Sequence, residues 1–139
     1  MFLTEQRRQI EESLIARYFP NFSLHRDTAI GTMKTNRGAM YHMAVELIHF
    51  PLGPPQVKVV TPLHDRTGKR LGQHGASGQM HHLGRDSHGA LVLCLHPPSR
   101  WTPGNTLYHS LLKARLWLEA WESYRKTGTP LDQFLRHGE

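Results

Sequence analysis

Cysteine is nearly absent from this chain, since Cys94 is the only one among its 139 residues. One thiol cannot form an internal disulfide, which argues against a small secreted module held together by disulfides. The chain also lacks any apolar run close to the ~20 residues that a membrane-spanning helix needs. Its first residues, Met1 to Arg8, contain no apolar signal region. We therefore expect a protein of the reducing cytoplasm, with no membrane partner.

Acidic residues are also scarce, with 11 against 17 lysines and arginines. The formal net charge is +6 with histidine neutral, and the pI is near 9.9. This balance suits an acidic partner, either a nucleic acid or an acidic protein surface. The basic residues are scattered, however, and aromatic residues do not alternate with them as they do in a groove for single-stranded nucleic acid. The sequence therefore argues against nucleic acid as the partner.

The overall composition is that of a globular protein, with 38% hydrophobic and 20% charged residues. The length suits a single hydrophobic core, so we expect one domain over residues 1–139. Residues 62–80 are rich in glycine, histidine and basic residues. This segment has no apolar periodicity and is predicted to be a mobile loop.

An amphipathic helix is predicted from Thr4 to Phe19, ending before Pro20. Its apolar residues recur every four positions, at Ile10, Leu14 and Tyr18, with Ile15 beside them. The charged residues are expected on the other faces of the helix: Arg7, Arg8, Glu11, Glu12 and Arg17.

A second, longer helix follows the turn at Thr102-Pro103-Gly104, with Asn105 or Thr106 as its N-cap. Gly128 and Pro130 are expected to end it. Its apolar residues have the 4-3-4-3 spacing of one buried helical face: Leu107, Leu111, Ala114, Leu118 and Trp121. A last segment, Leu131 to Leu135, is predicted to dock as one further turn.

Strands are expected between the two helices. The alternation of apolar and polar residues predicts a weak first strand in residues 22–33, a clear one from Met40 to Phe50 and a short one from Gln56 to Thr61. Ala90 to Leu95 is apolar and is either a last strand or an extended segment lying on the core. The order helix, antiparallel meander, Cys94 segment, helix predicts an α+β fold.

Several short stretches of the sequence follow one another in a particular order. They are Phe50-Pro51 with Pro54 to Val59, a histidine upstream of Cys94, Leu93-Cys94-Leu95, Trp101 to Leu107, and Trp117-Leu118 with Tyr124 and Thr127-Gly128. Together they resemble the ubiquitin-conjugating enzymes, and especially the prokaryotic members, which act in ubiquitin-like conjugation and antiviral defence operons. The resemblance covers roughly residues 3–128. Only a short segment follows the predicted long helix in this sequence, so we expect the domain to lack the terminal helices of many eukaryotic relatives.

The resemblance implies that Cys94 takes a ubiquitin-like protein as a thioester from an activating enzyme and passes it to a target nucleophile, usually a lysine amine. His82, and second to it His81, are the candidate donors to the thioester oxygen. His96 or His88 is a candidate for acting as a base or for lowering the pKa of the thiol. The first helix, with Arg7 and Arg8 exposed, is the implied docking surface for the activating enzyme. The chain itself needs no small-molecule cofactor, because the activating enzyme uses the ATP.

One departure from the family pattern concerns the oxyanion donor. The typical His-Pro-Asn triplet is absent, and its nearest match is His82-Leu83-Gly84, with a longer interval to Cys94. No asparagine lies between His82 and Cys94, so the identity of the donor stays open.

Two other interpretations remain at this stage. One is a binding module with the same fold and no activity, in which Cys94 is buried packing. The other is a zinc site built from neighbouring ligand-type residues, although their spacing matches no compact zinc motif. Those residues are His74, His81, His82, His88, Cys94 and His96.

Overall fold

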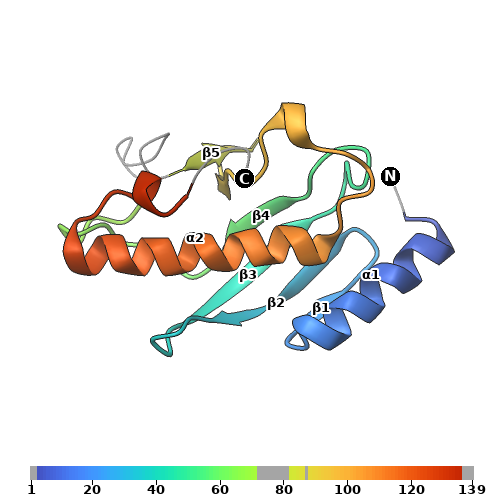
Figure 1. The fold of residues 1–139 in the computed structure, drawn as a ribbon, viewed down its shortest axis with the longest axis horizontal. Coiled ribbons are helices and arrows are strands. Elements are labelled where there is room, and N and C mark those ends of the chain that lie inside the picture. The colour runs from blue at the N-terminus through green and yellow to red at the C-terminus, as the bar shows by residue number, and fades with distance from the viewer. Residues whose placement is uncertain (1–2, 72–81, 87, 136–139) are drawn as a thin grey trace.

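The structure is a computed structural model, and it describes residues 3–71, 82–86 and 88–135. It is an α+β fold in which an N-terminal helix precedes a four-stranded antiparallel sheet, a short hairpin and a long C-terminal helix (Figure 1). The predicted fold class is therefore confirmed at this level. The elements are α1 (Glu5–Tyr18), β1 (Phe22–Leu24), β2 (Thr28–Lys34), β3 (Met40–Glu46), β4 (Gln56–Val59), β5 (Leu83–Arg85), β6 (Leu91–Leu93), η2 (Pro98–Arg100), α2 (Leu107–Thr127) and η3 (Leu131–Gln133).

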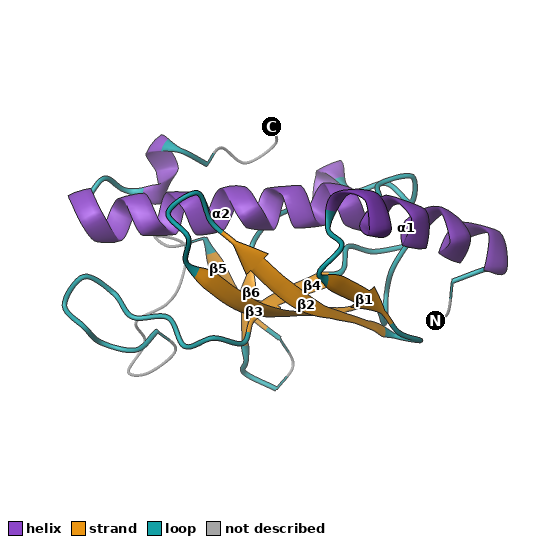
Figure 2. Ribbon diagram, turned by 90° about the horizontal axis from the view of Figure 1, so that it is seen from below, coloured by secondary structure: helices purple, strands orange, loops and turns teal. Residues whose placement is uncertain are grey.

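The molecule has two layers. The sheet has the strand order β1-β2-β3-β4, with each strand antiparallel to its neighbour. Both helices lie on the same side of this sheet, and α2 runs along it (Figure 2). The β5–β6 hairpin is a separate two-stranded sheet, and β6 lies against β4. The sheet residues that point toward the helices therefore form the core.

The long helix α2 has the predicted buried face. All five residues of its 4-3-4-3 stripe are buried, and Trp117 is fully buried beside them. The Thr106 side chain accepts a hydrogen bond from the His109 N–H and caps the start of the helix. Gly128 ends it with φ = 80°, a left-handed conformation that glycine adopts without steric cost. The predicted cap residues of this helix are confirmed, with Thr106 as the N-cap.

The buried face of α1 differs from the predicted one. Ile10 and Tyr18 are about half exposed, whereas Glu11 and Ile15 are buried. A carboxylate can be buried when a charged partner and hydrogen-bond donors compensate for the loss of water. Glu11 has both, because it pairs with Arg7 and accepts a hydrogen bond from the Leu107 N–H. The apolar pattern of this helix is therefore confirmed at Ile15 and wrong at Ile10 and Tyr18.

The strand boundaries also differ in part from the sequence prediction. Residues 22–33 contain two strands, β1 and most of β2, joined by a turn, instead of one weak strand. The strand at Met40 ends at Glu46, earlier than predicted, and Leu47 to Phe50 forms a turn. Tyr41, Met43 and Val45 are buried as the alternation predicts.

The segment that was predicted as a loop over residues 62–80 is described only up to residue 71. Its first part folds back on itself through a bridge between His64 and Arg70, with the Asp65 carboxylate holding the turn. Residues 72–80 lie outside the described part of the chain. Further on, β6 lies within the expected Ala90–Leu95 segment, and Leu131 docks fully buried in η3.

Candidate functional site

Cys94 follows directly after β6 and is exposed. It stands at a groove of about 630 Å³ between the end of the β5–β6 hairpin and the turn before β4. The peptide bond between Phe50 and Pro51 in that turn is cis. The residues that line the groove are His49, Gly53, Pro54, Pro55, Gln56, Val92, Leu93, Cys94, Leu95, His96 and Pro97.

The backbone of the hairpin holds Cys94 in place. The Cys94 N–H donates a hydrogen bond of 2.9 Å to the carbonyl of His82, which extends the pairing of β5 with β6 by one residue. Gly84 lies beside the sulfur, since a Cβ atom at this glycine would be 3.4 Å from the Cys94 Sγ. The absence of a side chain at Gly84 therefore leaves one side of the thiol uncovered.

The main chain of His82 lies beside that of Cys94, joined to it by the hydrogen bond above, and the ring of His82 is buried. The ring Nε2 lies 2.5 Å from Oδ1 of Asp132 in η3. His82 adopts φ = 54°, the left-handed region in which non-glycine residues are uncommon. It therefore links the start of β5 to the C-terminal segment and supplies the carbonyl that fixes Cys94.

His96 lines the same groove as Cys94. Its Nε2 is 2.8 Å from the Ser110 hydroxyl in α2, and its ring packs against Trp101 and His109. Burial, followed by the charges of Lys113 and His109, lowers the pKa of His96 to about 4. His96 is therefore neutral at neutral pH and does not supply a positive charge to the thiol.

The thiol itself is not activated. The walls of the groove partly remove it from water, and this burial raises the pKa of Cys94 above its ordinary value. Only a small fraction is thus thiolate at neutral pH. The Lys113 ammonium group contacts the residue that follows Cys94, since its Nζ donates to the carbonyl of Leu95 at 3.0 Å. This hydrogen bond engages the ammonium group with the main chain.

Three residues at or beside the groove were not identified from the sequence. Ser110 and Lys113 lie one turn apart on α2, and each holds a residue that follows Cys94. His49 lines the groove from the opposite wall. The i,i+3 spacing of Ser110 and Lys113 places both on one face of the long helix, and this could be read from the sequence. The spacing does not show which loop that face contacts.

The expectation that Arg7 is exposed is wrong. Only 21% of its side chain is exposed, and its guanidinium pairs with Glu11 and donates to the carbonyls of Pro103 and Asn105. Arg8 is partly exposed and pairs with Glu12, and it donates to the carbonyls of Leu24 and His25. Both arginines are thus engaged within the molecule, and their role toward a partner stays a prediction.

The remaining candidate ligands are partly outside the described residues. His81 and His74 both lie there. His88 is described and exposed, in the turn between β5 and β6. Within residues 3–71, 82–86 and 88–135, no group of three or more His, Cys, Asp or Glu side chains is placed to hold a metal ion.

Comparison of the chain with protein-family models, with curated proteins and with solved structures finds no match. None of the helices in the described part of the chain is long and apolar enough to cross a membrane. The site must therefore be interpreted from its own geometry and from the sequence motifs.

Proposed function

We propose that this chain is a ubiquitin-conjugating-like enzyme that carries a ubiquitin-like protein as a thioester on Cys94. In the first step the Cys94 thiolate attacks the thioester carbonyl on an activating enzyme, and the activating enzyme's thiolate leaves. In the second step a nucleophile of a target, such as a lysine amine, attacks the new thioester and Cys94 leaves as thiolate. The pathway we propose is cytoplasmic conjugation in bacterial antiviral defence, in line with the family resemblance.

The observation that carries this proposal is the exposure of Cys94 at a groove. A cysteine within an apolar run is more often buried packing than a nucleophile. In this structure solvent reaches the sulfur, which lies beside a glycine and next to a groove lined mainly by apolar and proline residues. Such a groove suits the extended C-terminal segment of a ubiquitin-like protein. The same exposure speaks against the alternative in which the fold is retained as an inactive binding module with a buried Cys94.

The unactivated thiol is compatible with the first step. Exchange of one thioester for another is nearly isoenergetic, so the enzyme needs to expose and position the sulfur more than to lower its pKa. A thiol with a raised pKa is also a poorer leaving group. The thioester on Cys94 is therefore more stable until an acceptor arrives. The hydrogen bond from the Cys94 N–H to the His82 carbonyl, together with the Lys113 contact to Leu95, supports a fixed sulfur position.

The second step needs a donor to the thioester oxygen, which can be worth ~3 kcal/mol. His82 remains the first candidate and His81 the second, with His96 as the candidate base. The Asp132 contact of the His82 ring and the neutral state of His96 favour a division of roles. In this division His82 donates to the thioester oxygen and fixes Cys94 through its main-chain carbonyl, while His96, neutral and in the same groove, accepts a proton as the base.

The partner surface that we propose is α1. Ile10 and Tyr18 leave an apolar area about half exposed on this helix, and Leu14 between them is half-buried. The net charge of +6 favours an acidic partner. We take the activating enzyme to dock here, with the ubiquitin-like protein and the target at the Cys94 groove.

The experiment that tests the proposal is thioester capture. The protein is mixed with ATP and with the activating enzyme and ubiquitin-like protein encoded beside it, and the products are separated on a non-reducing gel. The proposal predicts a shifted band that a thiol reductant removes and that Cys94→Ala lacks. An activating enzyme that charges itself while Cys94 never loads would leave the binding module as the better account.

A further inference from the structure

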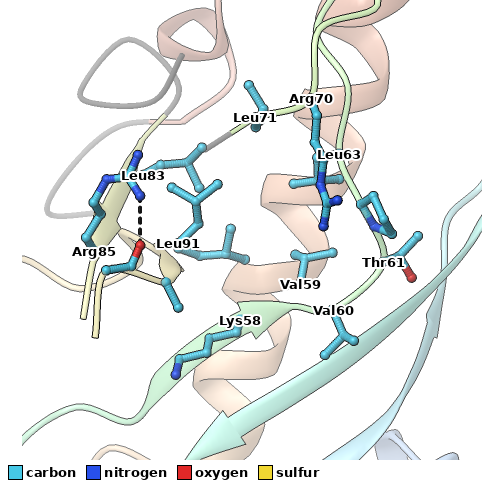
Figure 3. A pocket seen from close by; sticks show the side chains of 14 residues that line it. Lys58, Val59, Val60, Thr61, Leu63, Arg70, Leu71, Leu83, Arg85 and Leu91 are labelled. Atoms are coloured by element: carbon cyan, nitrogen blue, oxygen red, sulfur yellow. Dashed lines mark hydrogen bonds between the residues drawn. The ribbon is translucent and has the colours of Figure 1, made fainter. Parts of the chain in front are cut away.

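A second cavity lies away from the thiol, between β4 with the segment after it and the β5–β6 hairpin (Figure 3). Its volume is about 430 Å³, within the usual range for a small-ligand site. Cys94 does not line it, although Leu93 lines both this cavity and the Cys94 groove. The cavity is therefore a neighbour of the proposed active site and is separate from it.

The larger part of the lining of this cavity is apolar. The lining includes aliphatic side chains from the two walls and from the segment after β4, among them Val59, Leu63, Leu71, Leu83 and Leu91. Leu63, Leu71 and Leu83 are buried in the core, so the cavity opens directly onto packed hydrophobic residues. Such a lining favours a ligand with an apolar body, because its burial removes apolar surface from water.

One of the basic residues at this cavity is already neutralised. The Lys58 Nζ is 2.8 Å from a Glu46 carboxylate oxygen and 2.5 Å from one of Asp86. The hydrogen bond from Lys58, followed by those from the backbone N–H groups of Ala90 and His88, lowers the pKa of Asp86 to about 2. Lys58 is thus held by two carboxylates and has little charge to offer a ligand.

Arg70 differs from Lys58. No hydrogen bond or ion pair joins its side chain to another residue of the described chain, although a backbone bridge holds its main chain opposite His64. Figure 3 shows the Arg70 side chain extending into the cavity toward Val59. Across the cavity, Arg85 donates to the carbonyl of Gly89 at 2.7 Å, which holds this second guanidinium at the opposite wall. Arg70 is therefore a basic side chain of this cavity for which the described residues supply no countercharge.

We propose that this cavity binds a small ligand with an apolar body and a carboxylate, and that Arg70 binds the carboxylate. A guanidinium presents paired donors that match the two oxygens of a carboxylate. The apolar lining excludes a ligand that is highly charged over its whole length, because burying its other charges would be costly. The carboxylate is that of a free apolar acid or that of a peptide C-terminus ending in an apolar residue.

The test is ligand titration of the ¹⁵N-labelled full chain, followed by NMR at the backbone amides of the cavity walls. One pair of probes is 4-phenylbutyrate and its amide, and the other is acetyl-Ala-Leu-Leu with a free C-terminus and with an amidated one. We expect the acid of a pair to bind at least about fivefold more tightly than its amide. The pair with the larger difference identifies the source of the carboxylate.

Two variants make the test specific. Arg70→Gln is expected to abolish the preference for the acid, while Lys69→Gln, which makes the same change in charge on the neighbouring exposed residue, is expected to keep it. Ala90→Phe narrows the cavity at its wall and is expected to weaken binding of acid and amide alike, with circular dichroism reporting that the fold is kept.

Three results would overturn the proposal. The first is equal affinity for acid and amide in both pairs, and the second is the absence of saturable shifts with any probe. The third is shifts confined to the Cys94 groove. None of these measurements involves the thioester. Failure of the ligand proposal can therefore be distinguished from failure of the conjugation proposal.

Discussion

Glu11 is fully buried in α1, and its Oε1 accepts a hydrogen bond of 2.9 Å from the backbone N–H of Leu107, the first residue of α2. Its second carboxylate oxygen pairs with the Arg7 Nε at 2.7 Å. A negative charge at this place also suits the positive end of the α2 dipole. One carboxylate thus fixes the start of the helix whose Ser110 and Lys113 hold the segment after Cys94.

Replacement of Glu11 by Gln is expected to lower the free energy of unfolding by about 2–3 kcal/mol, because it leaves the mostly buried Arg7 without a countercharge. The matched control is Glu12→Gln on the same helix. Glu12 is about half exposed and pairs with Arg8, so its loss is expected to cost less than about 0.5 kcal/mol. Urea denaturation of the two variants measures both values. Equal decreases in unfolding free energy for the two variants would show that Glu11 does not link the two helices.

Gly31 is expected to be sensitive to any side chain. A Cβ atom there would lie 2.4 Å from Cγ of Phe22 and 2.6 Å from the carbonyl oxygen of Asn21. The β1–β2 pair would have to shift, so Gly31→Ala is expected to destabilise the protein by about 1–3 kcal/mol. Gly104→Ala is the control, since its Cβ would meet only the Thr102 hydroxyl oxygen at 3.9 Å. Thermal unfolding of both variants checks this, and an unchanged melting temperature for Gly31→Ala would contradict it.

His96 is expected to make the stability depend on pH. Burial lowers its pKa from an ordinary 6.5 to about 4 in the folded protein, so below pH 6.5 the unfolded chain binds a proton that the folded chain does not. This contribution to stability is present above pH 6.5 and is lost as the pH falls to about 4. We expect the advantage of the wild type over His96→Gln in unfolding free energy to shrink by about 2 kcal/mol across this window.

The same measurement has an internal comparison. The pKa of His109 is also lowered, mainly by burial, and this residue titrates in both proteins. Because it stacks on His96, a His109→Gln background should be included so that the two effects are separated. A difference between wild type and His96→Gln that is constant with pH would contradict the buried, neutral state of His96.

The reactivity of Cys94 is expected to follow its raised pKa. The rate of alkylation by iodoacetamide should rise about tenfold per pH unit from about pH 7 to about pH 8.5 without reaching a plateau. The unfolded chain, in which the thiol is no longer partly buried, is expected to react faster than the folded one at the same pH. Mass spectrometry of the modified chain gives both rates. A plateau below about pH 8 would instead reveal a cation that stabilises the thiolate.

The sequence predicted the elements whose signals are local. The 4-3-4-3 stripe of α2, its Thr106 cap and the Gly128 end depend on residues within a few positions of one another. The alternation in β3 is local in the same way. These predictions are confirmed because backbone geometry alone places such residues on one face.

The features that the sequence did not predict depend on partners far away in the chain. Glu11 is buried because of Arg7 and the N–H of Leu107, which lies 96 residues further on. The residue pattern around Glu11 is, by itself, that of a helix face exposed to solvent. Likewise, β5 is only three residues long and exists through its pairing with β6.

The candidate site divides in the same way. The sequence singled out Cys94 by its uniqueness and its neighbours, and His82 and His96 by their closeness to it. The groove wall at His49 and the contacts from Ser110 and Lys113 arise from packing of separate elements. Arg70 was one basic residue among many until the cavity in front of it was known.

The measurement that tests the central claim most directly is to load a Cys94→Ser variant beside the wild type and to treat both products with a thiol reductant and with alkaline hydroxylamine. If Cys94 is the acyl carrier, the wild-type adduct is lost in both reagents. The serine variant then forms, more slowly, an oxygen ester that survives the reductant and is cleaved by hydroxylamine. An adduct on the serine variant that is still removed by the reductant, or no wild-type adduct with a fully charged activating enzyme, would contradict the account.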